Sequence, residues 1–108
     1  MLTNEIHKKL LDAGLRDLLI EWGTDPFCVD KEVISDSDLD EFIIQKAEER
    51  WPDLIDYLCL YVIYDFEEKH WELFIRGGDL SVLDRCHVLD DDPLRGRALL
   101  ALKIAEVE

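Results

Sequence analysis

Two runs of aromatic and β-branched residues stand close together in the middle of the chain, between Tyr57 and Arg76. A short charged break at residues 66–69 separates them, and this arrangement predicts a β-hairpin. The first run is apolar at nearly every position from Leu58 to Ile63, which is typical of a strand covered on both faces, or nearly so. The rest of the chain is therefore expected to cover this hairpin.

Before the hairpin, the apolar positions recur at helical spacing. Thr3 can cap a helix that begins at Asn4 and runs to about Trp22. Gly14 is a position where this helix can bend or split, and Gly23 fits a C-terminal cap. The sequence thus predicts a long amphipathic helix at the start of the chain.

A second helix is predicted up to Arg50. Ser37 and Asp40 have the spacing of a capping box, with Asp in place of the usual Glu. Because Pro52 disfavours helical geometry in the residue before it, this helix should end near Trp51.

After the hairpin, Leu80–Asp90 is compatible with a short helix or a third strand, and we favour strand or irregular structure. Asp92 followed by Pro93 is typical of a helix start, and the stripe after it predicts a last helix to about Val107 that packs on the sheet. We therefore expect one α+β domain over residues 1–108. It has two N-terminal helices, an antiparallel β-hairpin or small three-stranded sheet, and a C-terminal helix.

The length and composition limit the class of protein. The 108 residues leave room for one domain with one core. No stretch is apolar for long enough to span a membrane, and residues 1–5 lack the features of a secretory signal, so we expect a soluble, cytoplasmic protein. Three widely spaced cysteines cannot all pair, and we expect them to be reduced and mostly buried, with Cys59 a small hydrophobe inside its strand.

Charge is the strongest compositional feature, because 26 acidic and 12 basic residues give a formal net charge of −14. Such a surface repels DNA, RNA and anionic lipid, so we expect no direct nucleic-acid or membrane binding and favour a basic protein as partner. Acidity that serves only solubility is the alternative. Residues 21–41 hold eight acidic residues and one basic residue, and residues 48–72 hold eight and two, so these two stretches carry nearly all of the net charge.

No catalytic, metal or cofactor motif is apparent. Cys86 and His87 are the one adjacent pair with nucleophile and base types, but neighbouring residues point apart in a strand and nothing completes a triad. The Cys and His residues lack zinc-ligand spacing, and Gly77-Gly78 lacks the Lys of a phosphate-binding loop. The acidic run Asp90–Asp92 could hold a divalent ion, but the helix macrodipole is enough to explain acidic residues at a helix N-terminus. We expect neither an enzyme nor a bound cofactor.

Carboxylates held on a rigid scaffold can act as phosphate surrogates or salt-bridge partners for a basic surface. An exposed aromatic residue within such an acidic field is a candidate binding hot spot. Trp51 is the predicted anchor, because it lies at the end of the second predicted helix, directly before a proline, with acidic residues on both sides. The predicted partner-binding carboxylates are Asp36, Asp38, Asp40, Glu41, Glu48, Glu49, Asp53 and Asp56.

The second half of the chain resembles small phage-encoded proteins with an α-β-α sandwich. The likeness rests on the run Leu60–Tyr64, the strand Trp71–Ile75 and the segment Asp92–Leu102, which reads Asp-Pro-Leu-Arg-Gly-Arg-Ala-Leu-Leu-Ala-Leu. The first half, including residues 21–41, departs from that pattern, and no functional residue carries over. The resemblance implies a mobile-element origin and action in the host cytoplasm, and small acidic phage proteins include anti-CRISPR proteins and other inhibitors of host defence.

Three functional hypotheses follow. The first is a stoichiometric inhibitor of the anti-CRISPR or nucleic-acid-mimic type, which binds the basic nucleic-acid-binding surface of a host defence complex. The second is an immunity protein that neutralises a bacterial nuclease toxin, for which charge steering would speed association. The third is a phage accessory domain without an inhibitory role. The oligomeric state cannot be predicted from the sequence.

Overall fold

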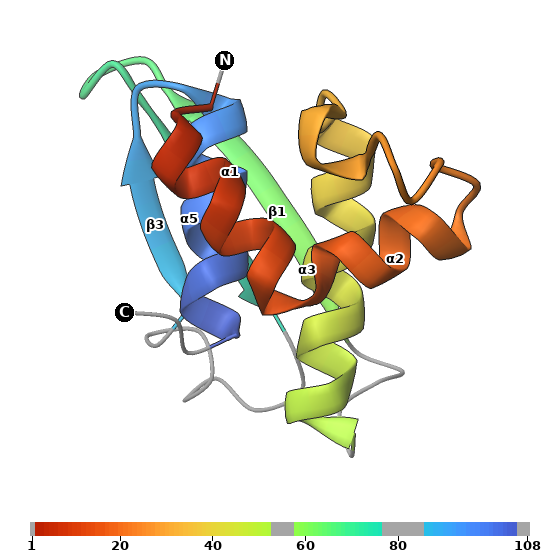
Figure 1. Cartoon of the computed structure of the whole chain (residues 1–108). Coiled ribbons are helices and arrows are strands. Elements are labelled where there is room, and N and C mark those ends of the chain that lie inside the picture. Colours follow the sequence, from red (N-terminus) through yellow and green to blue (C-terminus); the bar gives the residue numbers. More distant parts are fainter. Residues whose placement is uncertain (1, 53–57, 77–85, 106–108) are drawn as a thin grey trace.

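The computed structural model describes residues 2–52, 58–76 and 86–105, and Figure 1 shows its arrangement. The N-terminal half is helical, and the second half contains a sheet followed by one more helix, so the predicted α+β class is confirmed. In chain order the described elements are α1 (Asn4–Leu10), the π-helical turn η1 (Leu11–Leu15), α2 (Arg16–Glu21), the 3-10 turn η2 (Val29–Lys31), α3 (Asp36–Arg50), β1 (Cys59–Asp65), β2 (His70–Arg76), β3 (His87–Asp90) and α5 (Pro93–Ile104).

The first predicted helix is present but is split at Gly14, the position where a bend or break was expected. Thr3 caps α1 by accepting a hydrogen bond from the backbone N–H of Ile6 at 3.3 Å. Gly14 has a φ of 122°, a conformation that side chains other than glycine rarely adopt, and the chain changes direction there between α1 and α2. Gly23, with a φ of 112°, follows the end of α2 as the predicted C-terminal cap.

The hairpin also forms where the sequence predicts it. β1 pairs antiparallel with β2, from Cys59 opposite Arg76 to Asp65 opposite His70. The Asp65 carboxylate closes the turn by accepting hydrogen bonds from the backbone N–H groups of Glu67 and Glu68, at 2.9 and 3.1 Å. β3 pairs with the other edge of β2, so β2 is the central strand of a three-stranded antiparallel sheet.

The helices pack on one side of this sheet (Figure 1). The predicted contact of the C-terminal helix with the sheet is confirmed, because α5 lies against β2 and β3. α3 packs beside α5 and against β1, and α1 contacts α5 as well. Gly96 lets α5 approach the sheet closely, since a Cβ at this position would lie 2.5 Å from Cδ1 of Leu73. The core is therefore formed between the sheet, α5, α3 and the N-terminal helices.

Two expectations about burial were wrong. β1 is an edge strand with one face toward the helices, so its alternate residues Cys59 and Ile63 are exposed. Cys59 is thus not a buried hydrophobe, and Cys28 is also exposed, leaving Cys86 as the buried cysteine. The apolar pattern of β1 predicted two covered faces, but the described helices cover only one.

The end of the chain follows the prediction in part. Asp92 caps α5 by accepting hydrogen bonds from the N–H groups of Leu94 and Arg95, and Pro93 occupies the first turn. Of the ambiguous segment Leu80–Asp90, residues 87–90 form β3, whereas residues 80–85 lie outside the described part. Within the described part of the chain, no helix has the length and apolar character needed to cross a membrane.

Candidate partner-binding surface

α3 carries six of the predicted partner-binding carboxylates, and its capping fixes how they face. Ser35, not Ser37, is the N-cap: its hydroxyl accepts a hydrogen bond from the N–H of Asp38 at 3.2 Å, and the Asp38 carboxylate accepts one from the N–H of Ser35 at 3.1 Å. The predicted box was two residues too late. Capping at Ser35 places the buried residues Ile34 and Leu39 at the two positions of a hydrophobic staple. With Ser37 as the N-cap, both positions would be acidic residues.

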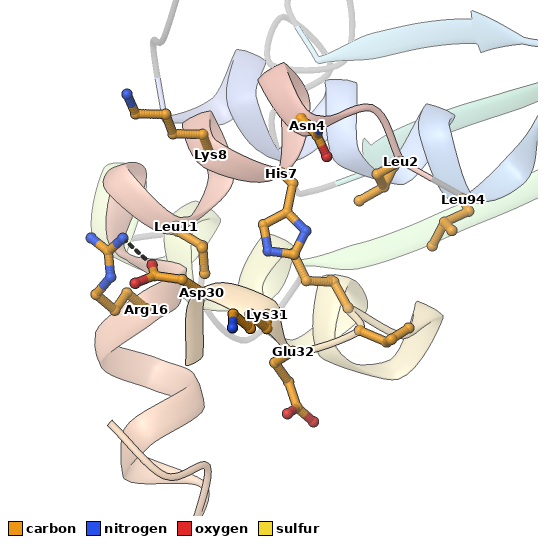
Figure 2. A pocket seen from close by; sticks show the side chains of 12 residues that line it. Leu2, Asn4, His7, Lys8, Leu11, Arg16, Asp30, Lys31, Glu32 and Leu94 are labelled. Carbon is orange, nitrogen blue, oxygen red and sulfur yellow. Dashed lines mark hydrogen bonds and ion pairs between the residues drawn. The ribbon is translucent and has the colours of Figure 1, made fainter. Parts of the chain in front are cut away.

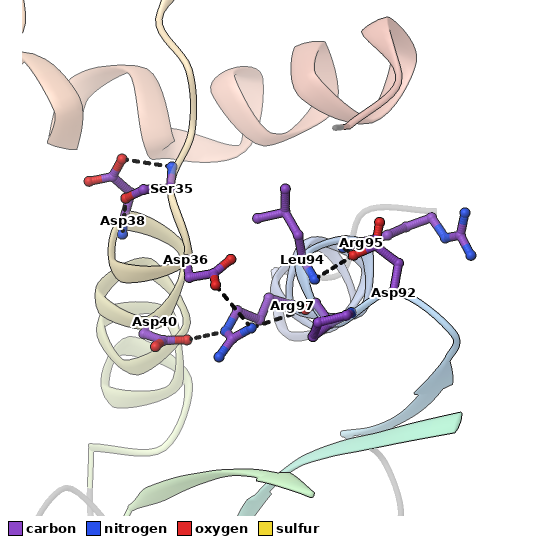
Figure 3. Close-up of polar contacts among 9 residues, drawn as sticks. Ser35, Asp36, Asp38, Asp40, Asp92, Leu94, Arg95 and Arg97 are labelled. Atoms are coloured by element: carbon purple, nitrogen blue, oxygen red, sulfur yellow. Dashed lines mark hydrogen bonds and ion pairs between the residues drawn. The ribbon is translucent and has the colours of Figure 1, made fainter. Parts of the chain in front are cut away.

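Asp36 and Asp40 face α5 and are held by Arg97 (Figure 3). The Arg97 Nε donates to Oδ1 of Asp40 at 2.8 Å, and its Nη1 lies 3.7 Å from Oδ2 of Asp36. The Arg97 side chain is only 14% exposed and also donates to the backbone carbonyl of Pro93 at 3.3 Å. These two carboxylates therefore tie α3 to α5, and the single positive charge of Arg97 offsets part of their charge.

Glu41 and Glu48 occupy the opposite side of α3. They are seven residues apart, so they share one face, at about 10 Å separation along the axis. Glu41 is exposed and Glu48 half-buried, whereas the buried residues of the helix, Leu39, Phe42, Ile43 and Ala47, face the core.

Asp38 and Glu49 flank this row. Asp38 is engaged through the capping box, and Glu49 pairs with Nζ of Lys46 at 3.2 Å. We call Asp38, Glu41, Glu48 and Glu49 the outer acidic face of α3. Asp53 and Asp56, the remaining predicted carboxylates, lie outside the described residues.

Trp51 does not stand out as an exposed anchor. It is half-buried and packs against the core, with the guanidinium of Arg50 4.9 Å from its ring centroid. Phe27 is the more exposed aromatic residue, at 97%. Its position is fixed by the preceding turn, in which the Asp25 carboxylate accepts a hydrogen bond from the N–H of Phe27 at 2.9 Å. The sequence reasoning missed Phe27, although the Asp-Pro-Phe turn after a glycine cap was a usable signal.

A pocket of about 680 Å³ opens between α1 and residues 30–34 (Figure 2). His7 points into this region, and its Nε2 is shielded from solvent and has no hydrogen-bond partner among the described residues. At the rim, Nη2 of Arg16 donates to Oδ1 of Asp30 at 2.6 Å. The lining combines aliphatic side chains with charged ones, of which Arg16 and Asp30 form an ion pair.

The other candidate chemistry is also accounted for by the fold. Cys86 is buried in the core, while Nε2 of His87 lies 2.8 Å from Oε1 of Glu72, so the two neighbours are not brought together. No group of three or more His, Cys, Asp or Glu side chains within residues 2–52, 58–76 and 86–105 could hold a metal ion.

The acidic run before α5 has structural contacts. Asp92 is the helix cap, and both oxygens of Asp90 accept hydrogen bonds from Nε of Arg95 at 3.0 Å. Burial alone would raise the pKa of Asp90, but the hydrogen bonds from Arg95 and from the N–H of Asp92 outweigh it and lower the pKa below its ordinary value. Asp90 is therefore expected to stay charged and paired.

Comparison with known proteins found no match to a protein-family model, to a curated protein or to a solved structure.

Proposed function

We propose that this protein is a non-enzymatic, stoichiometric inhibitor that covers a basic surface of a partner protein with the outer acidic face of α3. The observation that supports this most directly is the separation of the carboxylates of α3 into two sets. Asp36 and Asp40 are in contact with Arg97, whereas Glu41 and Glu48 lie on the side of α3 away from its buried residues. Since neither glutamate is needed to hold the fold together in the described contacts, their charge is available to a partner.

The density of charge bears on the kind of inhibition. α3 holds six acidic and two basic residues over 15 positions, a net charge of −4. At about 1.5 Å per residue, this is one net charge per roughly 5.6 Å of helix, against one per about 1.7 Å of duplex DNA. Such a density supports recognition by a few ion pairs within a basic groove better than a full imitation of a duplex. The partner we propose is the nucleic-acid-binding surface of a host defence complex.

Neutralisation of a nuclease toxin is the second candidate, and the exposure of Phe27 favours it. The side chain is 97% exposed and lies in the acidic stretch 21–41, and the backbone N–H of Phe27 donates a hydrogen bond within a short turn. An aromatic anchor near charged residues is typical of tight pairs of proteins, because the ring fills a pocket on the partner while the charges orient it.

The decisive experiment compares two charge reversals of equal size. Purified protein is used to capture binding partners from lysate at low salt, and the binding of each identified partner is then measured by calorimetry over a salt series. Glu41→Lys with Glu48→Lys should reduce the affinity at least tenfold, because two ion pairs become repulsive contacts. Glu67→Lys with Glu68→Lys is the matched control, because it changes the net charge equally on the exposed hairpin turn.

The outcomes separate the hypotheses. Loss of binding in the α3 variant alone supports the proposal, and recovery of a defence complex or of a single toxin domain distinguishes its two forms. An equal loss in both variants would mean that only the overall charge matters. Unchanged binding in both would remove the outer acidic face from the site.

A further inference from the structure

The outer face of the sheet, on the side away from the helices, has an apolar character that the described part of the chain does not explain. Alternation along the strands and the observed register place Tyr61 and Ile63 of β1, Phe74 of β2 and Leu89 of β3 on this face. Ile63 is 47% exposed and Leu89 54% exposed. The described helices all lie on the other side of the sheet (Figure 1).

The face is ordered by contacts among its own side chains. The rings of Tyr61 and Phe74 stack with centroids 5.1 Å apart and planes 7° apart. The ring of His87 meets Phe74 edge-on at 6.0 Å and bonds with Glu72 through its Nε2 at 2.8 Å. A flat, pre-ordered aromatic surface loses little side-chain entropy when it is covered.

The outer face also differs from the rest of the molecule in charge. Asp65, Glu72 and Arg76 are its charged residues, a net charge of −1 in a chain of net charge −14. Asp65 lies at one end of the paired strands and Arg76 at the other. Glu72 lies between Ile63 and Leu89 on the central strand, where its carboxylate is paired with His87. The opposite charges at the two ends of the face are complementary to those of a copy turned end to end.

We propose that a second copy of this chain covers the outer face, so that two sheets pack face to face in a homodimer. A two-fold axis between the sheets and perpendicular to the strands brings Arg76 of each copy toward Asp65 of the other. Aligned sheets pack about 10 Å apart with interdigitating side chains, which suits Ile63 and Leu89. The dimer would also account for the sequence of β1, which is apolar on both faces although the described helices cover only one.

The size of the face predicts a weak dimer. Three strands about 4.8 Å apart and seven residues of about 3.3 Å give a face of roughly 14 by 23 Å. This flat area of roughly 300 Å² is well below the ~800 Å² that each partner buries in a standard interface. The association should therefore depend on protein concentration and on salt, because salt screens the repulsion between two strongly acidic chains.

Sedimentation equilibrium tests the proposal on the purified full chain, from about 5 µM to about 500 µM protein, in about 20 mM and about 300 mM salt. We expect the dimer fraction to rise with concentration and the association constant to rise at least tenfold with salt. Ile63→Lys and, separately, Leu89→Lys should each weaken association at least tenfold. Val33→Lys is the matched control, because it adds the same charge at a more exposed apolar residue outside the sheet and should leave association unchanged.

Circular dichroism of each variant confirms that it folds, and the two sheet variants are independent, so misfolding of one leaves the other as a test. A monomer at every concentration and salt would overturn the proposal. So would a dimer that survives both sheet substitutions, or one that Val33→Lys weakens equally. The proposal does not rest on the proposed function, whose complex with a basic partner should weaken with salt.

Discussion

Replacing Arg97 with methionine should destabilise the fold more than the loss of an exposed ion pair would. Methionine keeps much of the side-chain volume but removes the hydrogen bond to Asp40 at 2.8 Å and the weaker contact with Asp36 at 3.7 Å. A hydrogen bond to a charged group contributes about 1.5 to 3 kcal/mol. Asp40 is 41% exposed and can partly rehydrate, so we expect a loss of about 2 kcal/mol.

Urea unfolding followed by circular dichroism measures this loss, and its midpoint should fall by about 1 to 2 M. A double-mutant cycle then separates the two carboxylates. The coupling of Arg97→Met with Asp40→Asn should be about 1 kcal/mol or more, and that with Asp36→Asn about 0.5 kcal/mol or less. Lys9→Met, which removes an exposed pair with Glu5, is the control and should cost less than about 0.5 kcal/mol.

The reasoning would be refuted if Arg97→Met cost no more than Lys9→Met. It would also be refuted if the coupling with Asp36 exceeded that with Asp40. The second result would mean that Asp36, not Asp40, is the main partner of Arg97. The first would mean that the bridge between α3 and α5 is not an element of stability. The carboxylates of Asp36 and Asp40 would then be as free for a partner as those of Glu41 and Glu48.

Two further predictions test the segments that precede α3 and α5. Ser35→Ala should lower the free energy of unfolding in urea by about 1 kcal/mol, because the Ser35 hydroxyl accepts a hydrogen bond from the N–H of Asp38. Ser37→Ala should change it by almost nothing. The reverse order would mean that Ser37 is the N-cap, as the sequence predicted. Asp90→Asn should destabilise the fold by roughly 1 kcal/mol at pH 7 by removing the ion pair with Arg95. Since the pKa of Asp90 is lowered on folding, its contribution is complete above the ordinary value of 3.8 and is lost as the pH falls through the lower folded value. The difference between variant and parent should therefore shrink below pH 4, and a constant difference in urea midpoint from pH 7 to pH 3 would contradict this.

The features that could be predicted from sequence are local. Thr3 fixes the start of the first helical segment through a side-chain hydrogen bond, and Gly14 and Gly23 fix its break and its end through backbone conformation. Asp92 with Pro93 starts α5 in an equally local way. The hairpin follows from two apolar runs around a turn. In each case the deciding contacts join residues that are close in the chain, which a pattern in the sequence can represent.

The features that were missed depend on distant contacts. Asp40 and Arg97 are 57 positions apart, and nothing near either residue shows that they pair. The same limit applies to the frame of the capping box, because the burial of Ile34 and Leu39 selects Ser35 over Ser37. A count of charges therefore cannot distinguish the carboxylates of α3 from one another. In the described part of the fold, Asp36 and Asp40 contact Arg97, whereas Glu41 and Glu48 have no such contact with α5.

The burial of β1 shows how a wrong expectation can still carry information. The run from Leu58 to Ile63 is apolar on both faces, and the inference that both are covered was wrong for the described part of the chain. A strand of this composition that exposes one face to water would lose hydrophobic stabilisation on every second residue. Covering that face by a second copy removes the conflict, and it leaves the outer acidic face of α3 on another part of the molecule. Because the two surfaces differ so strongly in charge, salt should act on them in opposite directions: it screens the repulsion that opposes the dimer and the attraction that holds a basic partner.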